Sequence, residues 1–435
     1  MEHYSNHVET LNKRLDDLLS DQDYDGIVFH SGELHYYFSD DSYAPFKTNP
    51  HFAHWLPLAG PGHMVVAKPN EKPKVIARIS EDYWYEPVTF DDPFWQSEFQ
   101  YKQTSNADES KAELGNVSRL AFVGEASSFA KEAGFSDDSI NPSTIVNRLD
   151  WNRSDKTSYE IDRIIRASEL AAAAHIAARR CFENGGTELD IHHAYIQAID
   201  AIDAELPYES IVALDEKGAF LHYVNKRTEG SGKVLLLDSG ATHLGYASDI
   251  TRTWTMPEAD PLFEKMRQDF DRLELELCEL VRPGLSFLDL HITAHKKIGK
   301  LLCDSGILKV SADDAFERGL TRPFFPHGLG HYLGIQVHDV AGRQENKDGG
   351  TIMPPDIYPF LRTTRTLSPT QVITIEPGLY FIEMLLRPFR SGDSKSAFDW
   401  DLIDRLKGHG GIRVEDDVVV TENGAENITR QIHPN

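Results

Sequence analysis

The sequence predicts an α/β protein of two domains, and three observations lead to that prediction. A chain of 435 residues with 40% hydrophobic residues is long enough to bury a large core. Over the first 155 residues, short apolar runs alternate with amphipathic helical segments, which is typical of α/β layers. The remainder combines long amphipathic helices with strands that carry isolated acids. We therefore expect a small α/β domain over residues 1–155 and a larger α/β (α+β) domain over residues 156–435.

The first domain is expected to begin with a helix and to continue with buried strands. One helical face is formed by apolar residues at helical spacing, namely Val8, Leu11, Leu15, Leu18 and Leu19. Short apolar runs bounded by polar or turn residues predict buried strands at Gly26–Phe29, Met64–Ala67, Val75–Ala77 and Leu120–Val123. We find no glycine-rich phosphate loop here, because Ser31-Gly32 alone is too weak a signal for a dinucleotide site.

A polar stretch at residues 150–155 separates the two domains. Thr157 and Glu160 have the spacing of a capping box that opens a long helix, and Asn184-Gly185 ends it. Two more amphipathic helices are expected at about 187–204 and 261–281. Residues 387–407 are polar and predict an inserted loop between two strands.

The composition argues against several functional classes. A formal net charge of -25 is unsuited to nucleic acid or anionic membranes, whose phosphates need clustered Lys and Arg. No apolar run approaches the ~18 residues that span a bilayer. The amino terminus lacks a secretion signal, so we expect a cytoplasmic protein. The chain has three cysteines, Cys181, Cys278 and Cys303, which we expect to be small core residues. So few cysteines fit a reducing compartment.

Two predicted strands, residues 233–241 and 245–254, carry one acid each within an apolar setting. If Thr242–Gly245 forms a tight loop, the strands pair as a hairpin in which Asp238 lies directly opposite Asp249. Two carboxylates so placed repel each other unless they share cations. The alternative is a hairpin whose aspartates point to water.

Three histidines, His327, His331 and His338, occur within residues 324–340. Three glycines lie between the histidines, and without side chains they let the backbone come close to a group bound by the rings: Gly328, Gly330 and Gly334. Imidazole is both a metal ligand and an acid near neutral pH, so one ring can bind metal while others donate protons. A single histidine here would more often be a satisfied core residue.

Two further acids lie at strand positions in the last quarter of the chain. Glu376 stands directly before Pro377, which keeps it extended at a strand end. Arg413 and Glu415 share one face of the last strand, either as a plain ion pair or as a metal ligand beside an anchor for a substrate carboxylate. Four buried carboxylates aimed at one place would require cations. Oxygen-rich ligation with one imidazole suits Mn(II) above all, with Co(II) or Zn(II) as alternatives.

Five segments resemble the signature motifs of the pita-bread metallopeptidases, which include methionine aminopeptidase, aminopeptidase P and prolidase: LLLDSGA, SDITRT, HGLGHYLG…VHDV, TIEPGLY and GGIRVEDD. Within that family the whole chain, including SDDSYAPFKTNPHF at 39–52, resembles the bacterial prolidases (Xaa-Pro dipeptidases) and their organophosphorus acid anhydrolase branch. The resemblance implies a small α/β domain followed by a pita-bread catalytic domain.

The resemblance also implies roles for individual residues. It implies two divalent ions held by Asp238, Asp249, His331, Glu376 and Glu415. Histidines that hydrogen-bond the substrate and its tetrahedral intermediate correspond to His222 and His338. The arginine near the carboxylate of the leaving proline corresponds to Arg413, and other substrate-pocket positions correspond to Tyr208, His327, Leu361 and Arg365.

The expected activity is hydrolysis of Xaa-Pro dipeptides to an amino acid and proline by a hydroxide shared by two ions. Glu376 would move the proton, and organophosphate triesters and fluorides would be side substrates. Asp41 would reach the substrate amine in a neighbouring subunit of a homodimer or a dimer of dimers; otherwise it is a surface acid. Three alternatives remain: an aminopeptidase P that acts on longer peptides, a non-catalytic pita-bread binding protein, and metal-free creatinase-like amidine hydrolysis.

Overall fold

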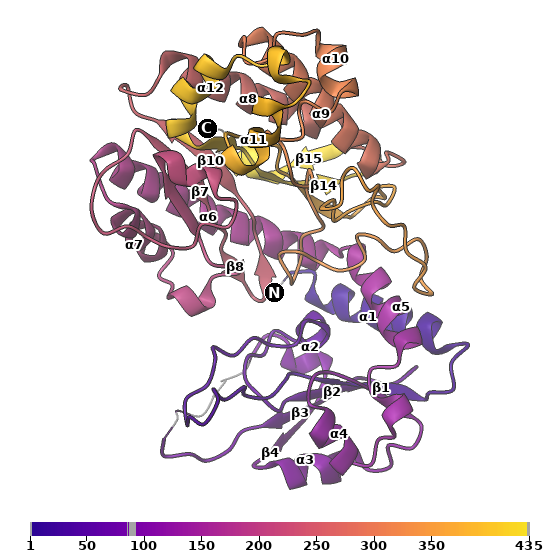
Figure 1. The fold of residues 1–435 in the computed structure, drawn as a ribbon. Coiled ribbons are helices and arrows are strands. Elements are labelled where there is room, and N and C mark those ends of the chain that lie inside the picture. The colour runs from indigo at the N-terminus through magenta and orange to yellow at the C-terminus, as the bar shows by residue number, and fades with distance from the viewer. Residues whose placement is uncertain (1, 85, 87–92, 433–435) are drawn as a thin grey trace. The chain divides into compact units, whose positions relative to one another are not determined.

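The computed structural model describes residues 2–84, 86 and 93–432, which fold into two compact units (Figure 1). The first unit contains Met1–Arg153, Thr157–Glu160 and Asn346–Gly350. The second contains Ser154–Lys156, Ile161–Glu345 and Thr351–Asn435. Two short segments beyond the expected boundary at 155/156 therefore pack with the first unit.

A mixed five-stranded sheet forms the centre of the first unit, in the order β4-β3-β2-β1-β5. Its strands are β1 (Gly26–His30), β2 (Met64–Ala67), β3 (Lys74–Arg78), β4 (Gln100–Thr104) and β5 (Leu120–Val123). β1 pairs parallel with β5 and antiparallel with β2, while β3 pairs parallel with β4. The four predicted strands are confirmed. The fifth, β4, is a polar edge strand that gives no apolar signal.

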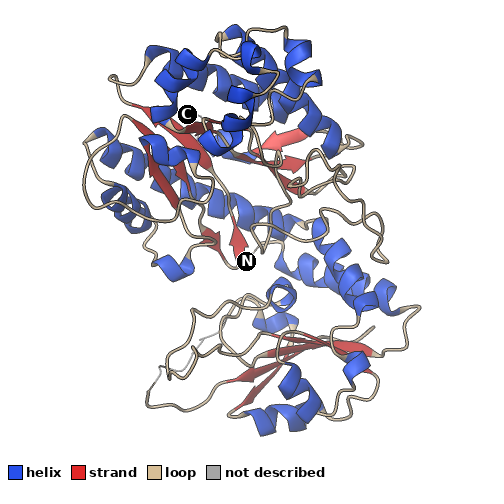
Figure 2. Ribbon diagram, in the orientation of Figure 1, coloured by secondary structure: helices blue, strands red, loops and turns tan. Residues whose placement is uncertain are grey.

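Helices cover both faces of this sheet (Figure 2). They are α1 (Tyr4–Leu19), α2 (Pro50–Trp55), α3 (Ala107–Leu114), α4 (Ser127–Glu132) and α5 (Ser143–Ser154). Neighbouring residues of a strand point to opposite faces, so Val28 packs with Phe129 of α4 while Phe29 packs on Trp55 of α2. The predicted apolar face of α1 is buried.

The second unit begins with a long helix and a three-stranded antiparallel sheet. The sheet has the order β10-β7-β6 and consists of β6 (Ile211–Leu214), β7 (Val234–Asp238) and β10 (Thr251–Thr255). Helices α6 (Ser158–Glu183) and α7 (Glu188–Ala198) pack on its outer face through a core that includes Phe182, Tyr195 and Leu235. The predicted capping box is confirmed, since Thr157 N donates to Glu160 Oε2 at 2.8 Å and Glu160 N to Thr157 Oγ1 at 3.4 Å.

The second of the expected helices, α7, ends at Ala198 rather than near residue 204. Asp200 adopts a left-handed φ of 51°, which an α-helix cannot contain, and a short 3₁₀ turn follows at Asp203–Glu205. The boundary expected at 204 is therefore wrong by about one and a half turns.

A second three-stranded sheet in the second unit has the order β11-β14-β15. It consists of β11 (Val372–Ile375), β14 (Asp416–Val420) and β15 (Ala425–Asn427), and a separate pair is formed by β12 (Gly378–Tyr380) and β13 (Gly411–Arg413). Helices of this part of the chain include α8 (Pro261–Leu280), α9 (Phe287–Asp304), α10 (Ala312–Glu317) and α13 (Ile428–Ile432). One isolated bridge, Thr251 to Glu415, joins β10 to the start of β14. The two sheets meet at that bridge.

Residues 387–407 do not form the expected polar loop. Most of them belong to α11 (Glu383–Ser391) and α12 (Trp400–Leu406). Phe398, Ile403 and Leu406 are buried in the main apolar core. Each helix is short and contributes few buried positions, so polar residues dominate the segment and hide its helical period.

The hairpin that carries the first two acids has a different register from the one expected. Its tip is β8 (Thr242–His243) paired with β9 (Tyr246–Ala247), so the turn residues are Leu244 and Gly245, both with positive φ. This shift places Asp238 opposite Thr251 rather than Asp249. The two aspartates are therefore diagonal neighbours across the ladder rather than a directly opposed pair.

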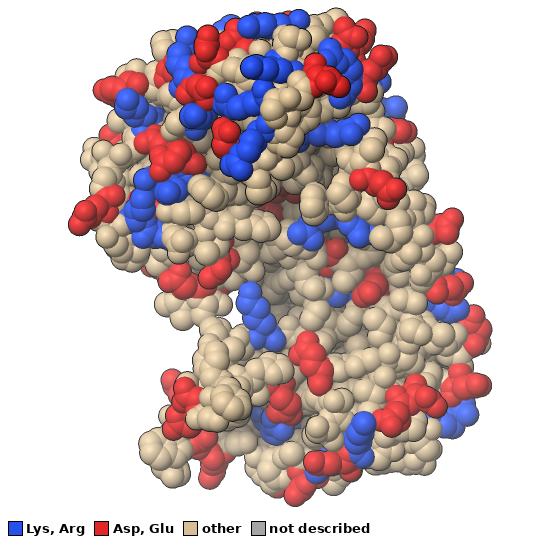
Figure 3. Space-filling model, in the orientation of Figure 1, with Lys and Arg blue, Asp and Glu red and all other residues tan. Residues whose placement is uncertain are grey.

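Acidic and basic side chains are interspersed over the face shown in Figure 3. No helix among the described residues is long and apolar enough to cross a membrane. All three cysteines are free thiols; Cys278 is buried, as expected for a core residue, while Cys181 and Cys303 are partly exposed.

Candidate metal centre and active site

Four of the five predicted metal ligands come from the ends of strands in both sheets of the second unit. Asp238 ends β7 and Asp249 precedes β10, while Glu376 follows β11 and Glu415 precedes β14. His331 lies on a segment held against β11, where Thr374 N donates to the His331 carbonyl at 2.9 Å. Strand ends are rigid supports, so the fold brings these side chains together from positions far apart in the sequence.

The side chains converge on one buried place. His331 Nε2 lies 3.4 Å from Asp249 Oδ2 and 3.7 Å from Glu376 Oε1. One ligand atom each from Asp249, His331 and Glu415 lie within 4.8 Å of one another. Asp238 joins the group through Arg413, whose Nη2 is 2.6 Å from Asp238 Oδ2. The geometry thus gathers four carboxylates around one imidazole.

Burial and mutual repulsion disfavour negative charge on these carboxyl groups. Burial raises the pKa of Glu376 to about 7, with Asp249 adding to the effect. Burial, then Asp249 and Glu376, raises the pKa of Glu415 well above its usual range. Burial also raises the pKa of Asp249. Burial opposes a charge on His331, but Asp249 and Glu376 outweigh it and raise its pKa. The centre therefore needs more positive charge than Arg413 and His331 supply.

The donor set fits divalent cations. Oδ1 of Asp238 is buried and, among the described residues, has no hydrogen-bond partner. A buried carboxylate oxygen without a partner is costly unless a cation faces it. Carboxylate oxygens with a single imidazole suit hard or borderline ions such as Mn(II). The residues present could thus hold the metal that the sequence predicts.

Hydrogen bonds from neighbouring residues orient the ligands. The Nδ1 of His331 lies 3.0 Å from the Tyr332 carbonyl, so Nδ1 carries the proton and Nε2 is left as an acceptor toward the carboxylates. The Tyr208 hydroxyl donates to Asp249 Oδ1 at 2.5 Å. The Thr251 hydroxyl donates to Glu415 Oε2 at 2.6 Å. These three ligands are therefore each fixed by a contact outside the cluster.

Arg413, His327 and Tyr380 form a polar chain beside the carboxylates. The Arg413 Nη1 donates to the Tyr380 hydroxyl at 2.9 Å, and His327 Nε2 lies 2.9 Å from that same oxygen. The Nδ1 of His327 is 3.7 Å from Glu376 Oε2. Burial, reinforced by Arg413, lowers the pKa of His327 to about 3. Of the two readings of Arg413, the ion pair is present, but its partner is Asp238 rather than Glu415.

Three other predicted residues lie at varying depth. The His338 ring packs edge-on against His331 with centroids 4.5 Å apart. Leu361 is buried, and together with His327 it lines a cavity of about 300 Å³. His222 is exposed, in a turn that follows a 3₁₀ helix. Their roles toward a substrate stay predictions.

Arg365 and Asp41 were assigned to the substrate by resemblance, and the structure shows the surroundings of each. The Arg365 guanidinium donates to Ser154 Oγ at 3.1 Å and lies over the Tyr332 ring. Asp41 is exposed in the first unit. Their assignments, to the substrate pocket and to the substrate amine of another subunit, stay predictions.

Sequence reasoning missed Thr251, Tyr380 and Asp417. Both carboxylate oxygens of Asp417 lie 3.3 Å from the Asp249 backbone nitrogen, which donates to them. Tyr380 is fully buried although its hydroxyl is polar. Asp417 lies two residues after Glu415, so the two side chains point to the same face of the strand. That spacing was the available signal for Asp417. Tyr380 and Thr251 gave none, because their partners are more than 30 residues away.

Comparisons with known proteins match both units. Residues 2–151 match the family described as Xaa-Pro dipeptidase, N-terminal domain, and residues 162–422 match metallopeptidase family M24. A protein named Xaa-Pro dipeptidase from Shewanella baltica (strain OS185) is 39% identical over 439 residues, covering 99% of this chain and 98% of that protein. Another of that name, from Shewanella woodyi, is 39% identical and covers 98% of each.

Solved structures share the fold. Aminopeptidase P from E. coli superimposes with a TM-score of 0.75 at 23% identity, covering 98% of this chain and 95% of that one. Proline aminopeptidase P II from Yersinia pestis gives 0.73 at 22% identity, covering 98% and 96%. These likenesses show the fold, a pita-bread domain that follows a smaller amino-terminal domain in the chain. With both family segments matched and full-length relatives at 39% identity, the chain belongs to metallopeptidase family M24, in the group with the amino-terminal domain of the Xaa-Pro dipeptidases.

Proposed function

We propose that this protein hydrolyses Xaa-Pro dipeptides to an amino acid and proline with two divalent metal ions. The observation that carries the proposal is the convergence of four carboxylates and His331 on one buried place. Support comes from full-length relatives named Xaa-Pro dipeptidase. A non-catalytic binding protein would not need all five ligand positions, and this chain has each of them.

Two ions held by the five ligands would acidify a water molecule and polarise the scissile carbonyl. Glu376 would accept the proton of that water and pass it to the leaving nitrogen. We assign the hydrogen bonds to the substrate and its tetrahedral intermediate to His338, which packs against His331, and to His222. Tyr208 keeps Asp249 in place while these protons move.

An Xaa-Pro bond is a tertiary amide without an N–H, so a pocket can select it by accepting a ring and offering no acceptor for an N–H. We assign the carboxylate of the proline to Arg413, with His327 beside it, and the proline ring to the wall that includes Leu361. Arg365 would support that pocket. Gripping both charged ends positions a short substrate at little entropic cost.

The free amine of the substrate is assigned to Asp41 of a second copy in a homodimer. Asp41 lies beside exposed aromatic side chains: Tyr36 is 60% and Phe38 is 99% exposed. Exposed apolar side chains of this kind are typical of surfaces that another protein covers. The three free thiols fit a reducing compartment, and we propose the cytoplasm.

The test is a substrate-length series with purified, metal-loaded protein. We expect Mn(II) to support cleavage of Xaa-Pro dipeptides, and cleavage to fall steeply for Xaa-Pro-Yaa and Xaa-Pro-Yaa-Zaa. Equal or faster cleavage of the longer peptides would favour the aminopeptidase P alternative. Metal analysis that finds fewer than two divalent ions per chain in the active protein would contradict the dinuclear mechanism.

A second candidate activity is hydrolysis of organophosphate triesters and fluorides. A metal-activated water attacks phosphorus as it attacks a carbonyl carbon, and the cavity of about 300 Å³ beside His327 offers an apolar wall for an ester group. The test measures turnover of P–F and P–O substrates by a sample that cleaves dipeptides. If that sample turns over neither, the protein does not have this second activity.

A further inference from the structure

The two sheets that supply the metal ligands meet at a single bridged pair. Thr251 and Glu415 exchange two backbone hydrogen bonds, Glu415 N to Thr251 O at 3.0 Å and Thr251 N to Glu415 O at 3.4 Å. Asp249 lies two residues before Thr251 on one side of this junction, and Glu415 lies on the other. This bridge and the bonds from Asp249 N to Asp417 hold the two ligands across the junction. One bridged pair of strands would by itself be a weak hinge.

A buried guanidinium crosses the same junction. Arg252 Nη1 donates to the carbonyl of Thr251 at 3.0 Å and to that of Glu415 at 2.9 Å. Its Nη2 forms an ion pair with Asp416 Oδ1 at 2.8 Å. Successive side chains of a strand point to opposite faces, so Arg252 and Asp416 meet on the face opposite the metal ligands. Three contacts from one planar group thus tie β10 to β14 directly behind Glu415.

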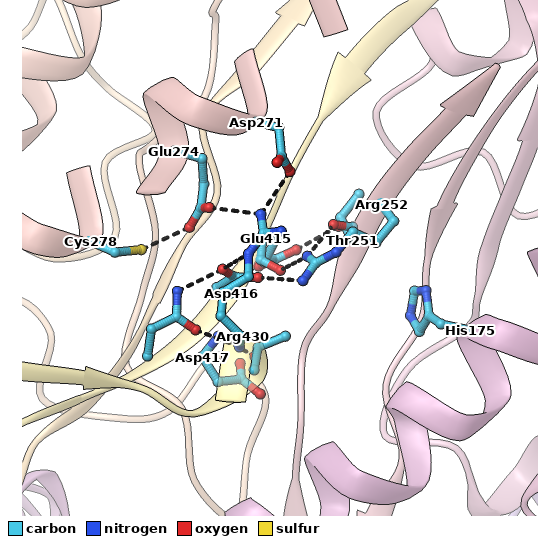
Figure 4. Close-up of polar contacts among 12 residues, drawn as sticks. His175, Thr251, Arg252, Asp271, Glu274, Cys278, Glu415, Asp416, Asp417 and Arg430 are labelled. Atoms are coloured by element: carbon cyan, nitrogen blue, oxygen red, sulfur yellow. Dashed lines mark hydrogen bonds and ion pairs between the residues drawn. The ribbon is translucent and has the colours of Figure 1, made fainter. Parts of the chain in front are cut away.

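A second arginine closes the cluster from the helical layer (Figure 4). Arg430 of α13 donates through Nε to Asp416 Oδ2 at 2.6 Å. Its Nη2 donates to Asp271 Oδ1 at 2.8 Å and to Glu274 Oε2 at 3.1 Å, both on α8. The Cys278 thiol donates to the other Glu274 oxygen at 2.8 Å. The strand junction is thereby fixed to two helices.

This cluster is not a second metal site, although atoms of Glu274, Cys278 and Asp416 lie within 4.8 Å of one another. Two guanidinium groups already occupy the two carboxylates, and a further cation there would face their positive charges. The charges of the cluster are instead compensated internally.

Stability alone does not account for so many buried charges. Arg252 is 3% exposed, and Asp416 and Glu274 are fully buried. Well-packed apolar side chains often stabilise a core as well as a buried ion network does. Apolar groups cannot, however, hold a carbonyl oxygen and a carboxylate at fixed positions, whereas the rigid fork of arginine can.

We propose that the cluster of Arg252, Asp416, Arg430 and Glu274 consists of positioning residues that set the spacing of Asp249 and Glu415 across the sheet junction, and thereby set metal affinity. The inference rests on the metal centre of the proposed function. It does not depend on which bond the centre hydrolyses.

The test is Arg252→Lys, which keeps the charge but cannot span two carbonyls and a carboxylate at once. Calorimetric titration of the metal-free protein with MnCl₂ should give an affinity about tenfold or more below that of the unchanged protein, the usual effect of losing a residue that orients a metal ligand. Arg430→Lys should lower the affinity in the same direction. The partly exposed rim residue offers a milder variant, Asp271→Asn, with a smaller loss.

The matched control is Arg148→Lys in the first unit. Arg148 is also a nearly buried arginine with two carboxylate partners, Asp21 at 2.5 Å and Asp348 at 2.9 Å. We expect this variant to lower the urea midpoint of unfolding while leaving Mn(II) affinity unchanged.

The proposal is overturned if the Arg252 and Arg430 variants lose stability like the control but bind Mn(II) as tightly as the unchanged protein, or if the unchanged protein binds no Mn(II). If Mn(II) binds and the variants weaken it while no Xaa-Pro dipeptide is cleaved, the positioning role stands and the proposed peptidase function falls. Should Arg252→Lys fail to fold, Arg430→Lys and Asp271→Asn decide between these outcomes.

Discussion

The hydroxyl of Tyr380 is the single atom that connects two groups assigned to the substrate. It accepts from Arg413 and lies 2.9 Å from His327 Nε2. We predict that Tyr380→Phe raises KM for Xaa-Pro dipeptides about tenfold with a smaller change in kcat. The reason is that a buried partner left unpaired is disfavoured by about 1–3 kcal/mol, and Arg413 would lose its fixed direction.

Steady-state kinetics checks this prediction, and Tyr4→Phe is the control. Tyr4 also loses a buried hydroxyl bond, to the Trp55 carbonyl at 2.8 Å, but within the first unit. The control should lower stability without changing KM. A fall in kcat at unchanged KM in Tyr380→Phe would instead place the hydroxyl in the chemical step.

Glu376 is the carboxylate to which we assign the proton. Replacing it with Gln keeps an oxygen ligand but removes the group that accepts a proton. We predict that Glu376→Gln lowers kcat by about 10²-fold or more, the range of general acid–base catalysis. Metal content should be measured on the same sample. Turnover within about tenfold of the unchanged protein, with metal retained, would show that Glu376 does not move the proton.

Single residues were predictable where their chemistry conflicted with their surroundings. An acid inside LLLDSGA or VITIEPG is conspicuous, because a charge in an apolar strand needs a partner. Thr251 and Tyr380 gave no such signal, since both are ordinary strand residues. Their partners, Glu415 and Arg413, are 164 and 33 residues away.

At the scale of elements, the segment that carries His331 depends on its close approach to β11. Gly330 has no space for a side chain, because a Cβ there would lie 2.0 Å from the Thr374 carbonyl oxygen. We predict that Gly330→Ala destabilises the protein by about 1–3 kcal/mol, as overpacking does, and weakens metal binding by displacing His331.

Urea unfolding and metal titration measure both effects. The control is Gly424→Ala, since a Cβ at Gly424 would meet nothing within 4 Å and its φ is not left-handed. It should change neither quantity. Unchanged metal affinity in Gly330→Ala would mean that the loop can shift without moving the imidazole.

The types of the apolar strands and long helices were predictable, whereas those of the polar α11, α12 and β4, and the hairpin register, were not. Apolar runs identified β1, β2, β3, β5 and β7, but the turn at Leu244-Gly245 moved the pairing of Asp238 from Asp249 to Thr251. Moving the centre of the turn by one residue moves the partner of Asp238 by two residues along the opposite strand. Side chains two residues apart point to the same face of the sheet, so both registers leave the same side chains on the same faces. The pattern of hydrophobicity therefore could not distinguish them.

At the scale of the whole molecule, neutral buried histidines in the first unit predict acid sensitivity. Backbone N–H groups donate to Nδ1 of His30 and of His63, each at 3.1 Å, and protonation would break both bonds. Burial lowers the pKa of His30 to about 3 and that of His63 to about 4, from 6.5. The unfolded chain binds these protons near pH 6.5, whereas the folded protein does not. The free energy of unfolding is therefore at its full value above pH 6.5 and decreases as the pH falls toward 4.

We expect each imidazole to lower the free energy of unfolding by about 1.4 kcal/mol per pH unit below 6.5. Urea unfolding at several pH values measures the slope. His63→Asn offers an oxygen acceptor that does not titrate. The dependence of the unfolding free energy on pH should therefore become less steep by the contribution of one histidine. His35→Asn, at an exposed position, should leave this dependence unchanged. An equal slope in both variants would contradict the role of His63.

The proposed dimer is also a property of the whole molecule. We predict that sedimentation velocity finds a dimer, and that Phe38→Ser shifts it toward the monomer because Phe38 is 99% exposed in the single chain. Asp41→Asn should leave the dimer intact and raise KM for dipeptides. A monomer that cleaves dipeptides at full rate would remove the role assigned to Asp41.

The sequence by itself determined the types and order of most elements, α11, α12 and β4 excepted, and the identities of the acids and histidines that cannot be buried without cations. Those properties are local, since they depend on hydrophobic period and on the cost of a charge in an apolar run. Only the tertiary structure decided which residues meet. It paired Arg413 with Asp238, set the hairpin register, and brought Arg252 and Arg430 to Asp416 behind the ligands. Such contacts join positions up to 175 residues apart, and long-range packing rather than local pattern selects them.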